Sequence, residues 1–528
     1  MRAQHSRTGL TSIEPDLASI GPRNGRRSAM KRSHAWNRRS RAVRVGRMNE
    51  GHMDRLTSID ASFLTNESDS SHMHVGAVLI FEGPPPNYDD FLEHVRGRMR
   101  LVPRFRQKLA FPPIETGRPF WVDDPNFNLA YHVRHSALPA PGSEEQLRNL
   151  VGRVFSQQLD RSKPLWELWL VQGLERNRFA LISKTHHALV DGVAGVDIGT
   201  VLFDLKPVPE PAEPDEGWVP SPPPSSAEMA ARGVKELTEA PFKLGRRALR
   251  ATRDPFTTAR RVSEAAQALG EVAWNFTDPA PDLPLNVEIG SHRRFVWTRA
   301  RLEDYKRIKD ALGGTVNDVV LTIVSGALRR WLDRRGIKTA GLELRALVPV
   351  SIRAEDERGG MGNRIAAMRG PLPVYVEDPV KRLEVVRRAM DGLKESKQAL
   401  GAEVISRFND FAPPTLLAQA SRINFSTRLF NLIVTNVPGP QIPLYVLGRE
   451  LEDVFPVAFL PENHALAIAI ISYNGGINFG LLADYDSMED VGVIADGLSV
   501  ARDELLGAAA SAEATVEADV PAGADLPG

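Results

Sequence analysis

With 528 residues, of which 42% are hydrophobic and 25% charged, the chain has the composition of a globular protein large enough for more than one domain. The 66 basic residues balance the 66 acidic ones, which argues against a globally basic nucleic-acid binder. The sequence contains no cysteine, so disulfides, cysteine nucleophiles and thiolate metal sites are excluded, as in many proteins of reducing compartments.

Both ends of the chain are predicted to be disordered. Residues 1–47 carry twelve Lys or Arg against two Asp or Glu, and they lack the apolar core of a secretory signal. We therefore interpret residues 1–52 as a disordered basic arm, which could be a tether to anionic membrane, a dispensable tail, or the product of a start codon placed upstream of Met48 or Met53. The Ala- and Glu-rich residues 508–528 form the second disordered tail.

Residues 53–205 are predicted to form a lobe that mixes helices and strands. The spacing of Phe91, Val95 and Met99 predicts an amphipathic helix, and Ser143 with Gln146 forms a capping box before another. Apolar runs rich in strand-forming residues predict extended segments; they lie at residues 73–81, 120–122, 129–135, 164–170 and 178–185.

Residues 206–285 separate this lobe from a second one. Prolines crowd the stretch from Lys206 to Ser226, which excludes a helix or a central strand there, and the basic segment that follows is compatible with a helix. That helix is interpreted as a solvated connection, with a lid or a lipid-facing helix as alternatives.

The second lobe is predicted to span residues 286–507. Thr315 is a candidate cap for a long apolar helix that ends near Trp331. Strands are predicted from Leu344 to Arg353, before Asn436, and on both sides of Asn474-Gly475, because Asn-Gly is a strong hairpin signal. The longest apolar region, 465–483, is thus two paired strands rather than a membrane span, and any membrane contact is expected to be peripheral. A helix near 488–506 completes the lobe.

The stretch from Lys184 to Gly192 contains the pattern His-His-x-x-x-Asp-Gly. Histidines at the end of a strand point to opposite faces, so only one of His186 and His187 can face a reaction channel. A neutral imidazole can remove a proton from an alcohol as it attacks a thioester, and Asp191 could orient the loop. The alternative is a structural histidine pair with Asp191 as an ordinary helix cap.

Five pieces of the sequence, spread over residues 53–506, resemble the bacterial wax ester synthase/acyl-CoA:diacylglycerol acyltransferase family, within the chloramphenicol-acetyltransferase-like superfamily. They occur in the order of that family: the opening at Leu56–Leu64, Pro164-Leu165-Trp166, the His-His-x-x-x-Asp-Gly pattern, Asn317-Asp318 and Asn436-Val437-Pro438-Gly439-Pro440. The resemblance implies an α/β (α+β) fold of two lobes, each with a mixed sheet flanked by helices, and an active-site channel between them.

The resemblance also implies the chemistry. An acyl group would pass from acyl-CoA to the hydroxyl of diacylglycerol or a long-chain alcohol, with His187 as general base, His186 as a flanking structural residue and Asp191 orienting the motif. Asn317 is the first candidate for the oxyanion donor, and Asn436 is a weaker one. The expected substrate-binding residues are Gly192, Pro164, Leu165, Trp166, Asp318 and Asn436, and Arg353 is the expected partner of Asp191.

No cofactor and no metal are expected, and acyl-CoA is a co-substrate. The partners are a diacylglycerol or long-chain alcohol and a membrane or lipid-droplet surface, with a cytoplasmic, peripherally bound location. Three alternatives remain. A serine hydrolase lacks its Gly-x-Ser-x-Gly elbow, because the nearest string, 497–501, ends in Ala501. A metal hydrolase could use Asp191 together with six histidines, although their spacing is not a known zinc signature: His72, His74, His132, His135, His186 and His187. The third is a non-catalytic lipid-binding member of the fold. Within acyl transfer itself, the other open reading is a different acceptor alcohol, such as a polyketide or a carrier-bound substrate.

Overall fold

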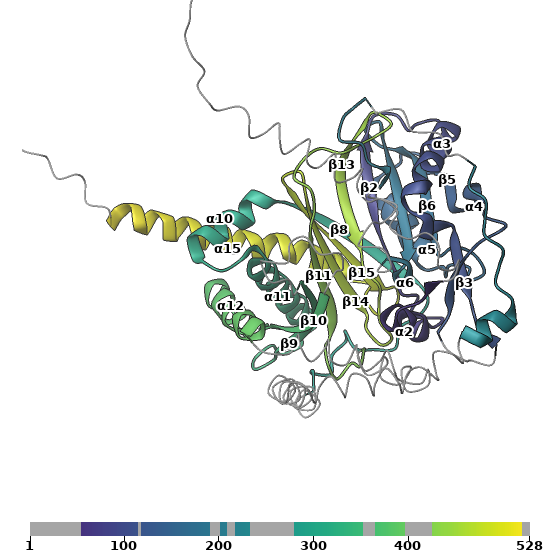
Figure 1. Ribbon diagram of the computed structural model, residues 1–528. Coiled ribbons are helices and arrows are strands. Elements are labelled where there is room, and N and C mark those ends of the chain that lie inside the picture. The colour runs from purple at the N-terminus through teal and green to yellow at the C-terminus, as the bar shows by residue number, and fades with distance from the viewer. Residues whose placement is uncertain are drawn as a thin grey trace, which may run out of the picture. The chain divides into compact units, whose positions relative to one another are not determined.

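A computed structural model describes residues 54–113, 118–190, 201–208, 217–232, 279–351, 365–395 and 425–519 (Figure 1). These residues all belong to one compact unit, His52–Gly528. The predictions for the basic arm at 1–52, for the basic segment from 233 to 275 and for the last residues of the tail lie outside the described residues, as does the helix predicted to follow Asp191, except for its end at residues 201–202. The start of the segment predicted to be compatible with a helix is described, and residues 226–232 are helical.

The first lobe is built on a six-stranded mixed sheet with the strand order β12-β13-β2-β7-β6-β5. Strands β5 and β6 run parallel, and the other neighbours are antiparallel. The bounds are β2 His74–Glu82, β5 Val133–Ala137, β6 Trp166–Leu174, β7 Arg178–His186, β12 Tyr445–Val446 and β13 Arg449–Val457. Every residue of β7 is buried, as the continuous apolar run predicted for a central strand.

Helices and a small sheet accompany this lobe. The three-stranded sheet has the order β1-β4-β3, with β1 Asp54–Arg55, β3 Gln107–Ala110 and β4 Phe120–Asp123. The helices are α2 Ser58–Asn66, α3 Tyr88–Arg98, α4 Leu129–His132 and α5 Glu144–Phe155. The capping box of α5 is confirmed, because Ser143 and Gln146 each bond the backbone of the other.

The prediction that residues 129–135 are extended is wrong in its first half. Residues 129–132 form the short helix α4, and only the residues from Val133 onward are a strand. The reason is local: the side chain of Asn128 accepts a hydrogen bond from the backbone N–H of Ala130 and so caps a helical turn.

The second lobe contains a six-stranded mixed sheet with the order β10-β9-β11-β14-β15-β8. The bounds are β8 Arg293–Arg301, β9 Leu344–Ser351, β10 Ile365–Leu372, β11 Leu432–Pro438, β14 Leu466–Tyr473 and β15 Gly476–Asp484. The predicted hairpin is confirmed: β14 and β15 pair antiparallel around Asn474 and Gly475, whose φ angles are 43° and 83°. Glycine and asparagine tolerate this left-handed backbone better than other residues.

Figure 1 shows α11, α12 and α15 together on one side of this sheet. The helices of the lobe are α10 Leu302–Leu312, α11 Val316–Arg334, α12 Pro379–Glu395 and α15 Val491–Asp519. Helix α11 is buried over most of its length from Asp318 to Leu332, in agreement with the long apolar run.

The prediction of disorder from residue 508 onward is wrong as far as residue 519, because α15 continues to Asp519. Two physical causes account for the longer helix. Alanine and glutamate have high helix propensity, and Arg307 on α10 forms an ion pair with Glu513.

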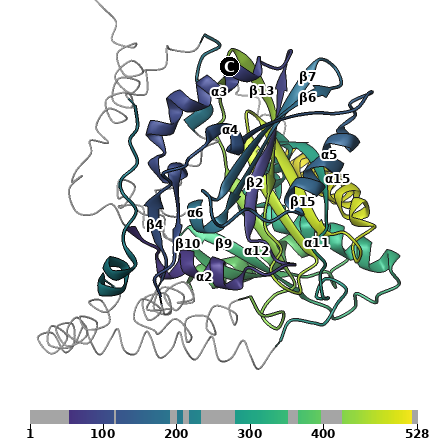
Figure 2. The ribbon, with the colours of Figure 1, turned by 90° about the vertical axis from the view of Figure 1, so that its right-hand side faces the viewer.

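The two lobes share the hairpin β12–β13, which comes from the second half of the chain but completes the sheet of the first lobe (Figure 2). Strand β13 also packs on β15 of the second sheet. A Cβ atom at Gly480 would lie 2.0 Å from the carbonyl oxygen of Pro456, so the close approach of the two backbones requires glycine. The rings of Trp297 and Phe455 stack at 4.7 Å beside it. The predicted fold class, two mixed sheets flanked by helices, is confirmed.

Candidate active site

The histidine pair lies where the central strand of the first sheet ends. The backbone N–H of His186 donates to the carbonyl of Leu165 at 3.0 Å, and that of His187 donates to the carbonyl of Met73 at 3.0 Å. The prediction that both histidines lie on the strand needs correction, because β7 ends at His186 and His187 begins the short helix α6, His187–Val190. The expected separation of the two rings nevertheless holds, since each ring has its own set of neighbours.

The ring of His187 lies in an aromatic enclosure. It stacks on Phe63 with centroids 3.9 Å apart and meets the edge of Phe459 at 5.6 Å. Its Nδ1 atom is buried and has no hydrogen-bond partner among the described residues. Burial of the ring lowers the pKa of His187 to about 4, so the imidazole is neutral at neutral pH. A neutral imidazole has a free lone pair and can accept a proton.

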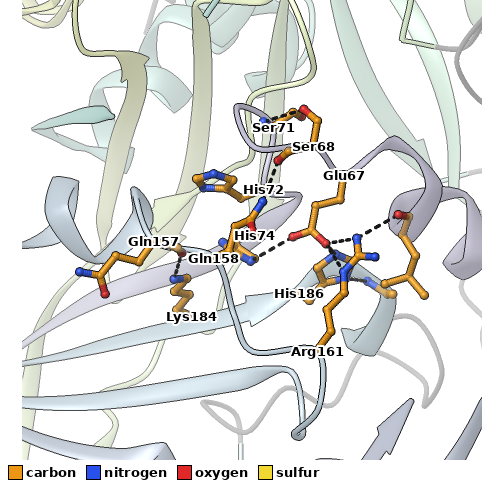
Figure 3. A network of polar contacts seen from close by, with 12 residues as sticks. Glu67, Ser68, Ser71, His72, His74, Gln157, Gln158, Arg161, Lys184 and His186 are labelled. Carbon is orange, nitrogen blue, oxygen red and sulfur yellow. Dashed lines mark hydrogen bonds and ion pairs between the residues drawn. The ribbon is translucent and has the colours of Figure 1, made fainter. Parts of the chain in front are cut away.

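His186 faces a different, polar environment. Its Nδ1 accepts a hydrogen bond from the backbone N–H of Ala188 at 3.1 Å, and its Nε2 lies 3.6 Å from Oε2 of Glu67 (Figure 3). The Glu67 side chain is only 4% exposed and also accepts from Nε of Arg161 at 2.7 Å. Burial alone would raise the pKa of the Glu67 carboxyl, but the contacts with His186 and Arg161 outweigh this effect and hold that pKa below its usual range.

The Pro-Leu-Trp segment supports the histidines from the neighbouring strand β6. Pro164, Leu165 and Trp166 are all buried, and the carbonyl of Leu165 accepts from His186 as described above. The indole of Trp166 donates to the carbonyl of Phe105 at 2.8 Å and stacks on His132 at 4.7 Å. These contacts are those of core residues, and their predicted part in substrate binding stays a prediction.

The polar residues predicted in the second lobe form a cluster of their own at the start of α11. Thr315 and Asp318 make a capping box, and the amide of Asn436 on β11 donates to Oδ1 of Asn317 at 3.4 Å. Asn317, Asp318 and Asn436 are thus brought together, and helix capping accounts for Asp318 by itself. Among the described residues, the contacts of this cluster and those of His187 share no side chain.

Three predicted site residues, Asp191, Gly192 and Arg353, lie outside the described residues. The pairing of Asp191 with Arg353 therefore stays a prediction. In the part of the chain that is described, no group of three or more His, Cys, Asp or Glu side chains is arranged to hold a metal ion. His72 and His74 lie near each other, with ring centroids 5.6 Å apart, but His132 and His135 do not join them.

The sequence interpretation missed Phe63, Glu67 and Phe459 as site residues. Phe63 and Glu67 belong to helix α2 and its C-terminal cap, in the opening segment that was noted only for its resemblance. The available signal was their spacing of four residues, which places both on one helix face. No sequence signal pointed to Phe459, because it follows β13, the strand that crosses between the lobes.

No single helix among the described residues is both long and apolar enough to cross a membrane. One bent pair, α10 with α11 at 101°, satisfies the criteria of length and composition when the two helices are taken together.

Comparison with known proteins gives a consistent picture over most of the chain. Residues 56–320 match the model of the wax ester synthase/diacylglycerol acyltransferase catalytic domain, and residues 361–505 match that of the WS/DGAT C-terminal domain. A diacylglycerol O-acyltransferase of Mycobacterium tuberculosis is 33% identical over 467 residues, covering 86% of this chain and 90% of the relative. A second one from that organism, tgs1, is 32% identical and covers 85% and 96%.

Solved structures extend the comparison to the fold. The wax ester synthase/diacylglycerol acyltransferase from Marinobacter aquaeolei VT8 superposes with a TM-score of 0.60 and 27% identity, covering 87% of this chain and all of the other. The starter condensation domain of rhizomide synthetase, solved with C8-CoA and Leu-SNAC, superposes with a TM-score of 0.52 at 14% identity, covering 88% and 95%. The latter similarity shows a shared two-lobed fold.

Proposed function

The chain belongs to the wax ester synthase/diacylglycerol acyltransferase family, and from that premise we propose that it transfers a long-chain acyl group from acyl-CoA to the hydroxyl of diacylglycerol. Long-chain alcohols are a second class of acceptor. The observation that carries the proposal is His187 itself, a neutral imidazole enclosed by Phe63 and Phe459 at the end of β7. The chain is an acyltransferase, and the identity of donor and acceptor is the part that is proposed.

The reaction requires one base and no covalent enzyme intermediate. The Nδ1 atom of His187 is shut off from solvent, so we assign proton transfer to Nε2. As Nε2 takes the proton of the acceptor hydroxyl, the oxygen attacks the thioester carbon and a tetrahedral oxyanion forms. The C–S bond then breaks, and the coenzyme A thiolate leaves with the proton that the imidazolium returns.

The oxyanion requires a hydrogen-bond donor, which contributes about 2.7 to 4 kcal/mol to the lowering of a barrier of this type. Asn317 is the proposed donor. Its Oδ1 is occupied by the amide of Asn436, which leaves its own N–H₂ group to donate. We propose that the segment that carries Asp191 orients His187 and that Arg353 is the partner of Asp191.

A location follows from the proposed substrates. Diacylglycerol and triacylglycerol reside in membranes and lipid droplets, so we propose a cytoplasmic protein that binds such surfaces peripherally. The basic residues of the arm at 1–47 are suited to anionic lipid. Cosedimentation with anionic and neutral vesicles at low and high salt would test this, and equal binding to both would contradict it.

The experiment that tests the reaction offers the purified protein one long-chain acyl-CoA with diacylglycerol, with a fatty alcohol, or with water alone. Products are identified by mass spectrometry. Triacylglycerol as the main product supports the proposal, and wax ester as the main product would reverse the order of the two acceptors. Release of free fatty acid as the main product in all three reactions would show a hydrolase instead.

A further inference from the structure

One helix holds both histidines of the pair. Helix α2 carries Phe63, which stacks on His187, and is followed by its cap residue Glu67, which faces His186. The backbone N–H of Glu67 donates to the carbonyl of Phe63 at 3.1 Å, so the two side chains are one helical turn apart. The base and its neighbour are therefore positioned by the same rigid element.

Glu67 is a buried carboxylate with defined partners. Its Oε2 receives Nε of Arg161 and lies near Nε2 of His186, whereas its Oε1 lies 3.7 Å from Nε2 of His74. Burial, together with the positive Lys184 nearby, places the pKa of His74 well below its usual value, so His74 is neutral and contributes no balancing charge. Lys184 directs its ammonium group away, to the carbonyls of Val154 and Gln157 (Figure 3).

Arg161 also ties this carboxylate to the end of α2. Its guanidinium donates to the carbonyl of Leu64 at 3.1 Å as well as to Glu67. The position of the carboxylate relative to the histidines is thus fixed from the solvent side by Arg161, which is itself 41% exposed.

One hydrogen bond of the His186 ring, at Nδ1, determines its tautomer, because Nε2 has no hydrogen-bond partner among the described residues and meets Glu67 only as a charge 3.6 Å away. A backbone N–H can only donate, so Nδ1 of His186, which accepts from Ala188, carries no proton. The proton of the neutral ring is therefore on Nε2, the nitrogen that faces Glu67. A carboxylate at this position favours that tautomer over the one that would present an N–H to Ala188.

The bond from Ala188 is also the cap of the helix on which His187 lies. Ala188 is the second residue of α6, and its N–H has no partner within that helix, so the ring of His186 serves as the N-cap side chain. Losing this bond frees the first turn of α6, which begins with His187. A shift of about 1 Å in a reacting group can cost on the order of 100-fold in rate.

We propose that Glu67 is a positioning residue of this acyltransferase: it fixes the Nε2–H tautomer of His186, whose Nδ1 then caps α6 and holds His187 against Phe63. The inference rests on the proposed role of His187 as base. In this proposal His186 links Glu67 to the backbone of α6, because its Nε2 faces the carboxylate and its Nδ1 accepts from Ala188.

A double-mutant cycle between Glu67→Gln and His186→Asn tests the inference. The Asn side chain places an oxygen where Nδ1 stood and is among the best N-cap residues, so it caps α6 without needing a carboxylate. Glu67→Gln alone should lower kcat for triacylglycerol formation about 10-fold, with the KM for acyl-CoA within about twofold of wild type. In the His186→Asn background the same change should leave kcat unaltered, because there is no tautomer to fix.

Two further variants serve as a control and as a substitute for Glu67→Gln. Glu93→Gln removes an exposed carboxylate paired with Arg96 and should behave as wild type. Glu67→Asp keeps the buried charge for Arg161 but withdraws it from His186, so the cycle can be repeated with it should Glu67→Gln prove insoluble. Losses that are additive in either cycle, or a wild-type kcat for a folded Glu67 variant, would overturn the inference.

A second readout needs no substrate. In NMR spectra of protein labelled with ¹⁵N-histidine, the signals of His186 can be assigned by their loss in His186→Asn. They should show Nε2 protonated and Nδ1 unprotonated at neutral pH. The Glu67→Gln variant should show the two tautomers mixed. A wild-type His186 protonated at Nδ1 would refute the inference, whereas wild-type protein that forms no acylated product would refute the proposed function.

Discussion

Two buried carboxylates lie at the two polar ends of the molecule: Glu67 beside the end of β7, and Asp318 at the start of α11. They are held in position by different kinds of contact. The Oδ2 atom of Asp318 accepts from Thr315, three residues away, and these bonds explain the start of a helix, whereas its Oδ1 atom is buried without a hydrogen-bond partner among the described residues. Glu67 accepts from Arg161 and lies 3.6 Å from Nε2 of His186, and both residues are far from it in sequence. A polar group held by distant residues has been placed by the fold as a whole, whereas the bonds of Asp318 with Thr315 arise within its own helix start.

The largest effect should come from His187. Replacing it with Ala removes the base, so the rate of acyl transfer should fall by roughly 10² to 10⁴-fold. Thermal unfolding should stay cooperative, because the ring that is lost packs mainly on Phe63 and Phe459. Initial rates and melting curves on the same preparation check this. A variant with nearly full activity would remove His187 from the chemistry.

The pair Asn317→Ala and Thr315→Ala separates function from capping at the other end. Loss of an oxyanion donor should reduce kcat by about 10² to 10³ in Asn317→Ala. Loss of the cap in Thr315→Ala should reduce the free energy of unfolding by about 1 kcal/mol and change kcat little. Rates and denaturant titrations of both variants decide it, and equal kcat in the two would show that Asn317 serves only the helix.

His186→Ala should fall between these cases. It removes the cap of α6 and leaves Glu67 buried with one partner fewer, so the melting temperature should drop and the rate should decrease less than in His187→Ala. Parallel rate and melting measurements distinguish the two histidines. If His186→Ala is inactive and fully stable while His187→Ala stays active, the base has been assigned to the wrong ring.

The smallest effect concerns pH. Because burial lowers the pKa of His187 to about 4, the imidazole stays neutral and kcat/KM should be flat from about pH 8 to about pH 5, where an ordinary histidine would lose activity near 6.5. The unfolded state binds more protons between these two pKa values, so the unfolding free energy should decrease as pH falls through that range. The measurement is kcat/KM as a function of pH, and full recovery of activity on return to neutral pH shows that the protein did not unfold irreversibly. A fall in kcat/KM centred near pH 6.5 would contradict the prediction and show that the ring is accessible to water.

Much of the fold follows from local patterns in the sequence. The run 178–185 predicts β7, Asn474-Gly475 predicts the β14–β15 turn, and Ser143 with Gln146 predicts the start of α5. In each case the determining interactions lie within a few residues. Local patterns failed where distant contacts decide, as in the β12–β13 crossover. The extension of α15 past residue 507 has a local cause that the prediction of a disordered tail neglected, because Ala and Glu both favour a helix.

The site divides along the same line. The sequence pattern identified His186 and His187, and it grouped Asn317, Asp318 and Asn436, which the structure brings together. The spacing of four residues between Phe63 and Glu67 places both on one helix face, but it could not show that Glu67 is buried, because a glutamate after a short helix has the same local signature in either case. Only the packing of α2 against α6 and the approach of Arg161 set it apart.

Direct acyl transfer with His187 as the base can be tested by two measurements on one reaction, the intact mass of the protein and the release of coenzyme A. The protein is mixed with long-chain acyl-CoA, and diacylglycerol is added afterwards. With His187 as the base of a direct transfer, we expect no acyl adduct on the protein, coenzyme A release only after the acceptor is added, and almost no release from His187→Ala. An acylated protein before the acceptor is present, or release from His187→Ala at the wild-type rate, would contradict it.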